Sequence, residues 1–206
     1  MNWLAHVLLS KKDAEYQIGN FLADPLKGRP WADASIAVKE GMLMHKAIDK
    51  FTDTHAIVAQ SKSRLGKGYL KGVVLDLLYD HFLAINWDKY SSLSQAEFLQ
   101  TFYTNAQPIA QGYPTEAKRI VINLITSNIL SSYGEFEGFV ESLKRIDKRL
   151  SPRVKEKEST ISYKGIIEQE YENLKSDFEL FFPELMHFFK QHELGCKHQH
   201  FLMNDI

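Results

Sequence analysis

The chain has 206 residues, of which 44% are hydrophobic, so it is long enough for one domain with a sizeable core. Its formal net charge of −1 argues against a nucleic-acid-binding protein of the strongly basic class. The single cysteine, Cys196, cannot form a disulfide within one chain, which indicates a reducing compartment. The apolar segment from Trp3 to Leu9 is too short to span a bilayer and lacks the flanks of a signal peptide, so we expect a soluble cytoplasmic protein that makes no use of a membrane.

Apolar residues recur with a helical period along almost the whole chain, and no stretch alternates with the period of two that a half-buried strand requires. In chain order, the sequence predicts helices at about 2–9, 14–23, 35–51, 54–65, 69–87, 94–107, 114–129, 136–146 and 163–182. The run at 69–87 is too long for a strand and is expected to form a central, mostly buried helix.

Turn and capping residues mark the ends of these segments. Pro25 ends the second helix, and Ser94 with Glu97 forms a capping box at the start of the sixth. Pro183 is expected to kink or divide the last helix. The sequence therefore predicts an all-α fold, a single-domain helical bundle over residues 1–190, followed by a C-terminal tail at 191–206.

The most informative feature is a set of ionisable residues, all within the first 81 positions, in otherwise apolar helical segments: His6, Asp24, His45, Asp49, Asp76, Asp80 and His81. A buried carboxylate needs a partner or a metal. Imidazole and carboxylate together suit Mn, Fe, Zn or Mg. Residues four apart on a helix share a face, so His45 projects with Asp49, and Asp76 with Asp80. His81 points roughly 100° away from Asp80.

Each of these residues alone also has an ordinary explanation. A histidine on an apolar face is more often a hydrogen-bonded core residue than a ligand. Asp49 can pair with Lys46, and Asp24 can form a turn before Pro25. Asp76 is harder to explain in this way, because apolar residues surround it. Taken together, the set favours a shared metal or catalytic site. The tail residues His192, Cys196, His198 and His200 match no zinc motif well.

Basic residues cluster in two places. Arg64, Lys67 and Lys71 precede the predicted central helix, and a second group follows later: Lys144, Arg145, Lys148, Arg149, Arg153, Lys155 and Lys157. Such clusters are commonly solvated faces. The alternative is a docking surface for an acidic partner, and we expect Arg64, Lys67 and Lys71 to form part of one.

Four segments carry a resemblance to a known family. MNWLAHVLLS, GNFLADPLKG, GMLMHKAIDKFTDTH and LDLLYDHFLAINW resemble, in order and spacing, segments of the bacterial acyl carrier protein phosphodiesterases. That family is similar to the HD-type metal-dependent phosphohydrolases, so the resemblance implies an HD-like arrangement around the central helix. The match is specific to about Trp87 and looser to about Phe189. Pro25 departs from the family, which often has a bulky apolar residue there, and could re-aim Asp24.

The resemblance implies hydrolysis of the phosphodiester between a serine of acyl carrier protein and 4′-phosphopantetheine, with Mn2+ preferred and Mg2+ or another divalent cation as an alternative. The family's functional positions fall here on His6, Asp24, His45, Asp49, Asp76 and His81. We assign Asp24, His45, Asp49 and Asp76 to the metal. His6 and His81 are candidates for general acid or phosphate contact, with Asp80 orienting.

Two other functions stay open: an HD-like phosphohydrolase of a nucleotide or small phosphate ester, and a non-catalytic helical interaction protein. The basic clusters favour a protein substrate, because acyl carrier protein is strongly acidic. The intact set of histidines and aspartates disfavours a non-catalytic role.

Overall fold

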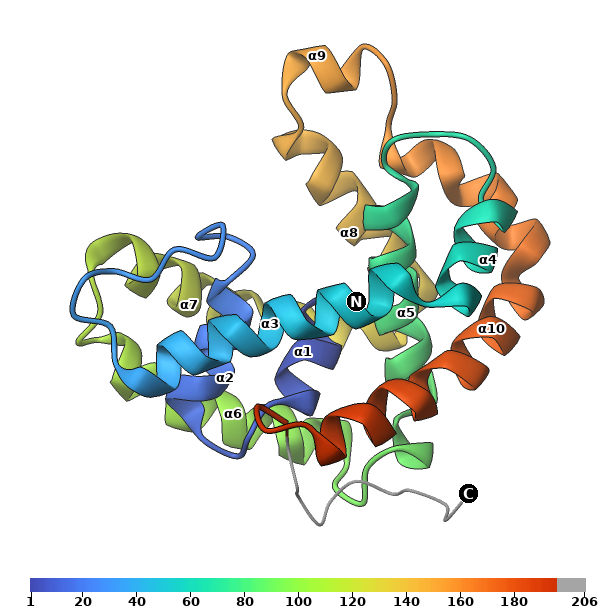
Figure 1. The fold of residues 1–206 in the computed structure, drawn as a ribbon. Coiled ribbons are helices and arrows are strands. Elements are labelled where there is room, and N and C mark those ends of the chain that lie inside the picture. The colour runs from blue at the N-terminus through green and yellow to red at the C-terminus, as the bar shows by residue number, and fades with distance from the viewer. Residues whose placement is uncertain (196–206) are drawn as a thin grey trace.

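The computed structural model describes residues 1–195, and this part of the chain contains helices but no β-strand (Figure 1). The α-helices are α1 (Trp3–Leu9), α2 (Ala14–Leu22), α3 (Ile36–Thr54), α4 (Ala56–Arg64), α5 (Lys71–Ile85), α6 (Gln95–Ala110), α7 (Thr115–Ser127), α8 (Phe136–Arg149), α9 (Pro152–Lys155) and α10 (Lys164–Gln191). Short 3-10 helices lie at η1 (Trp87–Lys89), η2 (Ile129–Gly134) and η3 (Thr160–Tyr163). The predicted all-α, single-domain fold is confirmed. Within residues 1–195, no helix combines the length and apolar character that crossing a membrane requires.

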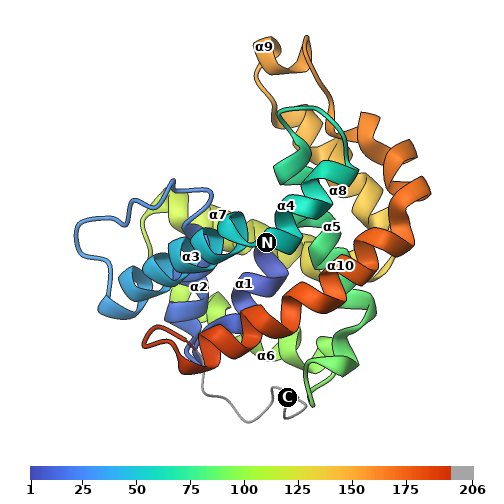
Figure 2. The same ribbon diagram turned by 45° about the vertical axis from the view of Figure 1, so that its right-hand side comes forward.

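Helix α5 lies at the centre of a group of four other helices. Helices α1, α4, α8 and α10 all pack against it. Its residues Val74, Leu78 and Phe82 are fully buried, as the long apolar run in the sequence predicts. Since α1 and α5 are in contact, the beginning of the chain is held at the middle of the molecule, beside α3 (Figures 1 and 2).

Helices α2 and α3 lie side by side (Figure 1), and glycines allow their close approach. A Cβ atom on Gly19 would collide with the backbone of Val38, and one on Gly41 would collide with the backbone of Tyr16. Any larger residue at either position would push the two helices apart. This contact holds α3 against α2, which also packs against α1.

Of the two outcomes expected at Pro183, division of the helix is wrong, because α10 continues through this residue to Gln191, whereas a kink stays a prediction. Proline removes one backbone hydrogen bond from a helix interior. Buried aromatic residues on both sides of the proline, Phe182 before it and Phe189 after it, anchor both halves in the same core. Burial of large apolar side chains can offset the lost hydrogen bond.

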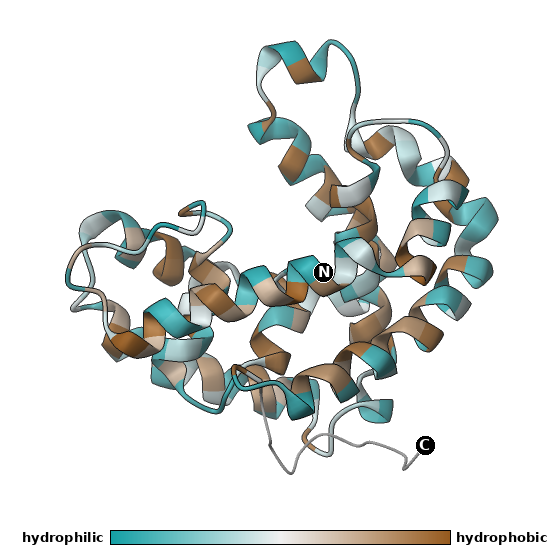
Figure 3. Ribbon diagram, viewed as in Figure 1, coloured by the Kyte–Doolittle hydropathy of each residue, from teal (hydrophilic) through white to brown (hydrophobic). Residues whose placement is uncertain are grey.

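The C-terminal end of α8 and helix α9 project from the rest of the molecule, with α9 at the tip (Figures 1 and 2). Apolar and polar residues alternate along α8 with a helical period, so the helix has one apolar side (Figure 3). Phe139 and Leu143 on that side are fully buried. The proposed boundary between a domain at 1–190 and a tail at 191–206 stays a prediction, since the histidines at 198 and 200 and Cys196 lie outside the described residues.

Candidate metal centre

A pocket of about 310 Å³ opens where the beginning of the chain meets α3, α5, η2 and α8. Its lining includes acidic, basic and apolar side chains: Met1, Asn2, Trp3, Asp24, His45, Asp49, Thr52, Asp53, Val73, Asp76, Leu77, Ile129, Tyr133, Ser142, Arg145, Ile146 and Arg149. The structure thus gathers Asp24, His45, Asp49 and Asp76 around one pocket, although they come from three separate parts of the chain.

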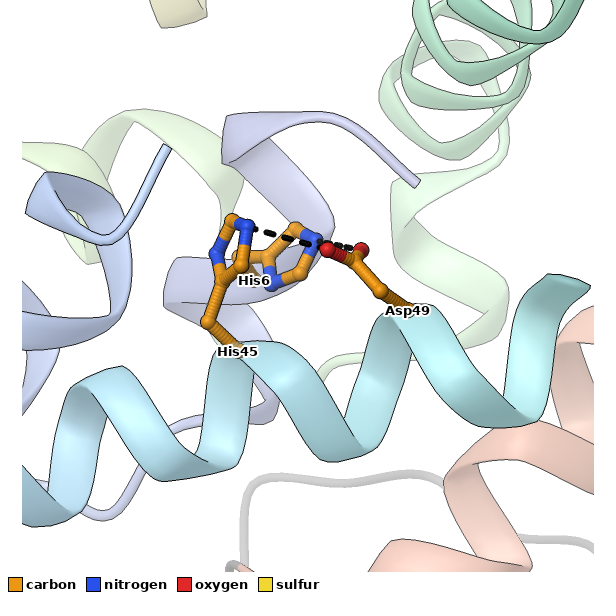
Figure 4. Close-up of side chains that lie close together, drawn as sticks. All are labelled: His6, His45 and Asp49. Atoms are coloured by element: carbon orange, nitrogen blue, oxygen red, sulfur yellow. Dashed lines mark ion pairs between the residues drawn. The ribbon is translucent and has the colours of Figure 1, made fainter. Parts of the chain in front are cut away.

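Two histidines converge on one carboxylate at this pocket (Figure 4). His45 and Asp49 project from the same face of α3, and His6 reaches them from α1. Nε2 of His6 lies 3.3 Å from Oδ1 of Asp49, and Nε2 of His45 lies 3.2 Å from Oδ2. One ligand atom from each residue fits within a group in which all atoms lie within 4.8 Å of one another.

Asn20 fixes the tautomer of His6. The amide nitrogen of Asn20 donates to the carbonyl oxygen of His6 and to the hydroxyl of Ser10, so its oxygen is the remaining acceptor. Nδ1 of His6, 2.9 Å from that oxygen, must therefore carry the proton. In the neutral ring, Nε2 then presents a lone pair toward Asp49. Two acceptors that face each other favour a cation between them.

The charge states match this geometry. Burial and, to a smaller extent, the nearby His45 lower the pKa of His6 to about 4, so the ring is neutral near pH 7. Burial alone would raise the pKa of the Asp49 carboxyl, but its contacts with the His45 and His6 rings hold it well below its usual range. An ionised carboxylate and neutral imidazole nitrogens are the forms in which these side chains bind metals.

Two buried polar atoms beside this cluster have no hydrogen-bond partner among the described residues: Nδ1 of His45 and Oγ1 of Thr52. Buried polar groups normally find a partner, so an unpaired one in a pocket indicates a missing ligand or water. The donor set and these unpaired atoms fit a divalent cation held by His6, His45 and Asp49.

Asp24 and Asp76 line the same pocket but lie outside the three-residue cluster. Oδ2 of Asp24 accepts a hydrogen bond of 3.1 Å from the indole of Trp3, and Pro25 does not turn Asp24 away from the pocket. Oδ1 of Asp76 lies 2.9 Å from the amino group of Met1, which is buried. Both carboxylates therefore face the centre from other sides of the pocket.

Asp80 and His81 do not line the pocket. The carboxylate of Asp80 is fully buried and accepts hydrogen bonds from the backbone of Leu4, at 2.7 Å, and of Ala5, at 3.3 Å. It caps the first turn of α1, where Asn2 provides no side-chain cap. His81 is hydrogen-bonded to the carbonyl oxygen of Tyr133 through Nδ1 and to the hydroxyl of Tyr171 through Nε2. These contacts support structural roles for both residues in place of the catalytic roles expected from the sequence.

The first basic cluster also differs from a simple docking surface. Nε of Arg64 lies 2.9 Å from the buried carboxylate of Asp177, and the guanidinium also contacts Glu170. Nζ of Lys71 contacts the carbonyl oxygen of Gly66 at 3.3 Å, and Lys67 is exposed. None of the three basic residues lines the pocket. Arg64 thus ties α4 to α10, whereas the two lysines stay accessible.

Sequence reasoning did not assign Asn20, Thr52, Arg145 or Arg149 to the site. Nothing local marks Asn20 or Thr52, because their roles depend on contacts between helices. The two arginines did carry a signal, since they are four residues apart on an amphipathic helix and share a face with Ile146.

Known proteins resemble this chain over most of its length. The family model described as acyl carrier protein phosphodiesterase matches residues 1–185. The acyl carrier protein phosphodiesterase of Photorhabdus laumondii is 29% identical over 95% of this chain and 98% of its own length. The protein of the same name from Yersinia enterocolitica is 30% identical over 90% of this chain and 96% of its own. No solved structure matches the chain significantly, so the HD-like arrangement stays a prediction. The chain belongs to the acyl carrier protein phosphodiesterase family.

Proposed function

We propose that this protein hydrolyses the phosphodiester of holo-acyl carrier protein, releasing the apo-carrier and 4′-phosphopantetheine, with a divalent cation, Mn2+ by preference, as cofactor. The observation that carries the proposal is the convergence of His6 on His45 and Asp49, which line the pocket, in a chain that belongs to this family. We also propose that the reaction takes place in the cytoplasm, in keeping with the single cysteine.

The two histidines and Asp49 would hold the cation. A divalent cation in such a site polarises phosphoryl oxygens and lowers the pKa of an attacking water. Asn20 supports this role, because it holds His6 in the tautomer whose Nε2 faces the centre. The low pKa of His6 keeps that nitrogen unprotonated in neutral solution.

We assign to Asp24 and Asp76 the role of a general base for the water that attacks phosphorus. Both carboxylates line the pocket, and each can accept a proton from a water molecule bound there. As the bond from water to phosphorus forms, the bond from phosphorus to the serine oxygen breaks. The proton that the water loses can be returned to the serine oxygen, so the proton count balances within the pocket. We assign no step of the reaction to Asp80 or His81. The carboxylate of Asp80 is hydrogen-bonded to the backbone of α1, and the imidazole of His81 is hydrogen-bonded to Tyr133 and Tyr171.

An acidic carrier requires a complementary surface. Lys67 is exposed, and Lys71 begins the helix whose next turns supply Val73 and Asp76 to the pocket. We propose that these two lysines contribute to carrier docking.

The test is incubation of the protein with Mn2+ and holo-acyl carrier protein, followed by mass spectrometry of both products. The expected result is conversion of the carrier to its apo form with release of 4′-phosphopantetheine. EDTA and the Asp49→Asn variant should each prevent it, whereas Asp33→Asn, which changes an exposed aspartate away from the pocket, should not. An unchanged carrier, with turnover of nucleotides or small phosphate esters, would favour the small-molecule phosphohydrolase instead.

A further inference from the structure

One side of α8 forms a wall of the pocket. Ser142, Arg145, Ile146 and Arg149 all line it, and no other residue of α8 does. Their spacing of three and four places them on a single face of the helix. Two guanidinium groups, one turn apart, therefore border the same cavity as the candidate metal centre.

These two arginines are not used to hold the fold together. Between residues 1 and 195, neither guanidinium takes part in a recorded hydrogen bond or ion pair, and both side chains are exposed. Other charged side chains of α8, in contrast, interact with neighbouring protein groups. Lys144 pairs with Glu141 at 2.6 Å, and the carboxylate of Asp147 accepts from Ser159 and Thr160.

Asp24, Asp49 and Asp76 also line the pocket, yet none of them pairs with an arginine of α8. The positive charge of Arg145 does reach Tyr133 in the lining, where it acts against the rise in the pKa of Tyr133 that burial causes. The same pocket thus contains carboxylates that can bind a cation and guanidinium groups that can bind an anion.

We propose that Arg145 and Arg149 bind the non-bridging oxygens of the scissile phosphodiester and hold it against the metal centre of His6, His45 and Asp49. The proposal rests on the proposed function, and it identifies the residues that bind the phosphate. A phosphodiester has a single negative charge shared by two non-bridging oxygens. Both oxygens can accept from the arginines, and one of them can also contact the bound cation.

Arginine suits this task for a geometric reason. Its planar guanidinium offers paired N–H donors that match two oxygens of a phosphate, which a lysine ammonium cannot do. Donors that are already in place when negative charge builds on the phosphoryl oxygens also stabilise the transition state. The arginines should therefore contribute both to binding and to turnover.

The first experiment measures binding and does not depend on turnover. Inorganic phosphate is titrated calorimetrically into the Mn2+-loaded full-length protein. We expect Arg145→Gln and Arg149→Gln each to weaken phosphate binding by about ten-fold or more, and the double variant to weaken it further. Lys148→Gln is the matched control, because Lys148 is an exposed cation on the same helix that does not line the pocket. Its affinity should equal that of the parent protein.

The second experiment separates phosphate binding from carrier docking. Kinetics are measured with bis(p-nitrophenyl) phosphate, a phosphodiester without a carrier, and with holo-acyl carrier protein. The arginine variants should lose about ten- to hundred-fold in kcat/KM on both substrates, and Arg→Lys variants should recover only part of this. Lys148→Gln should match the parent on the small diester. Circular dichroism should show unchanged helicity, since both side chains are exposed.

The outcomes are distinct. Unchanged phosphate affinity in the double variant overturns the proposal. Loss on the carrier alone, with normal turnover of the small diester, also overturns it and makes the arginines part of a docking surface. If the parent protein binds phosphate through these arginines but leaves holo-carrier intact, the phosphate site stands and the proposed substrate fails.

Discussion

The imidazole rings of His6 and His45 are stacked, with centroids 4.0 Å apart and planes inclined by 22°. Two protonated rings would repel each other at this separation, so the stack disfavours a charge on both rings at once. Both rings direct Nε2 toward Asp49. Two ring nitrogens and a carboxylate that converge in this way form a ligand set that a divalent cation would complete.

The first prediction concerns metal binding. Mn2+ should raise the melting temperature of the parent protein, because a ligand that binds only the folded state stabilises it. Asp49→Asn should lose most of this increase, since it removes the carboxylate that both histidines contact. Asp33→Asn should keep it. Differential scanning calorimetry with and without Mn2+ measures the effect, and an equal increase in all three proteins would count against the three-residue centre.

The second prediction separates the two remaining acidic residues of the pocket. Asp24→Ala should abolish hydrolysis with little loss of stability, because Trp3, the hydrogen-bond partner of the Asp24 side chain among residues 1–195, stays partly exposed. Asp76→Ala should abolish hydrolysis and also destabilise the fold by about 1–3 kcal/mol, since the buried amino group of Met1 loses its partner. Asp76→Asn should keep more stability than Asp76→Ala. Urea unfolding with activity assays tests this, and full activity in either alanine variant would remove that residue from the mechanism.

The third prediction concerns Asp80, the buried cap of α1. Asp80→Ala leaves the backbone N–H groups of Leu4 and Ala5 without acceptors, so we expect a loss of about 1–3 kcal/mol in unfolding free energy. Well below its melting temperature, the variant should keep kcat within a few-fold of the parent. If the variant folds normally but has lost turnover completely, Asp80 takes part in the reaction and the prediction is wrong.

The sequence identified the elements of this fold but could not distinguish the roles of similar residues. Helical periodicity and caps located most helices to within a few residues, because these signals are local. Asp76 and Asp80 look alike in the sequence, one turn apart on an apolar helix. Their difference arises because α1 packs on α5 at Asp80 and covers it, while Asp76 stays at the pocket. Contacts between distant segments decide such roles, and periodicity carries no information about them.

The pairing of Arg64 with Asp177 shows the same limit. A basic residue before the central helix suggested docking, whereas its guanidinium is bound to a carboxylate of α10 far along the chain. Likewise, α10 passes through Pro183 because tertiary packing outweighs a local helix-breaking signal.

The fourth prediction concerns pH. Burial lowers the pKa of His81, although its hydrogen bond to Tyr133 acts in the other direction. The folded-state pKa therefore lies below the unfolded value of about 6.5. The unfolded chain takes up a proton more readily, so the contribution of His81 is present above about pH 6.5 and is lost as the pH falls below it.

His81→Gln should remove this part of the pH dependence, because glutamine can still donate to Tyr133 and accept from Tyr171. Unfolding free energies are measured for both proteins at pH 7.5 and pH 5.5. The parent should lose more stability than the variant between these values. The same loss in both would show that His81 does not titrate in this way.

The last prediction concerns recognition of the acidic carrier by Lys67 and Lys71. Lys67→Glu with Lys71→Glu should raise KM for holo-acyl carrier protein far more than it lowers kcat, because it reverses charge beside the pocket without changing the pocket lining. The increase in KM should become smaller as salt screens the charges.

The matched control is Lys39→Glu with Arg119→Glu, an equal charge change at exposed positions on α3 and α7, outside the pocket lining. Arg64 is left unchanged, because its replacement would free the buried carboxylate of Asp177. Kinetics at low and high salt test the prediction, and equal constants for the two double variants at both salt concentrations would reduce the lysines to an ordinary solvated surface.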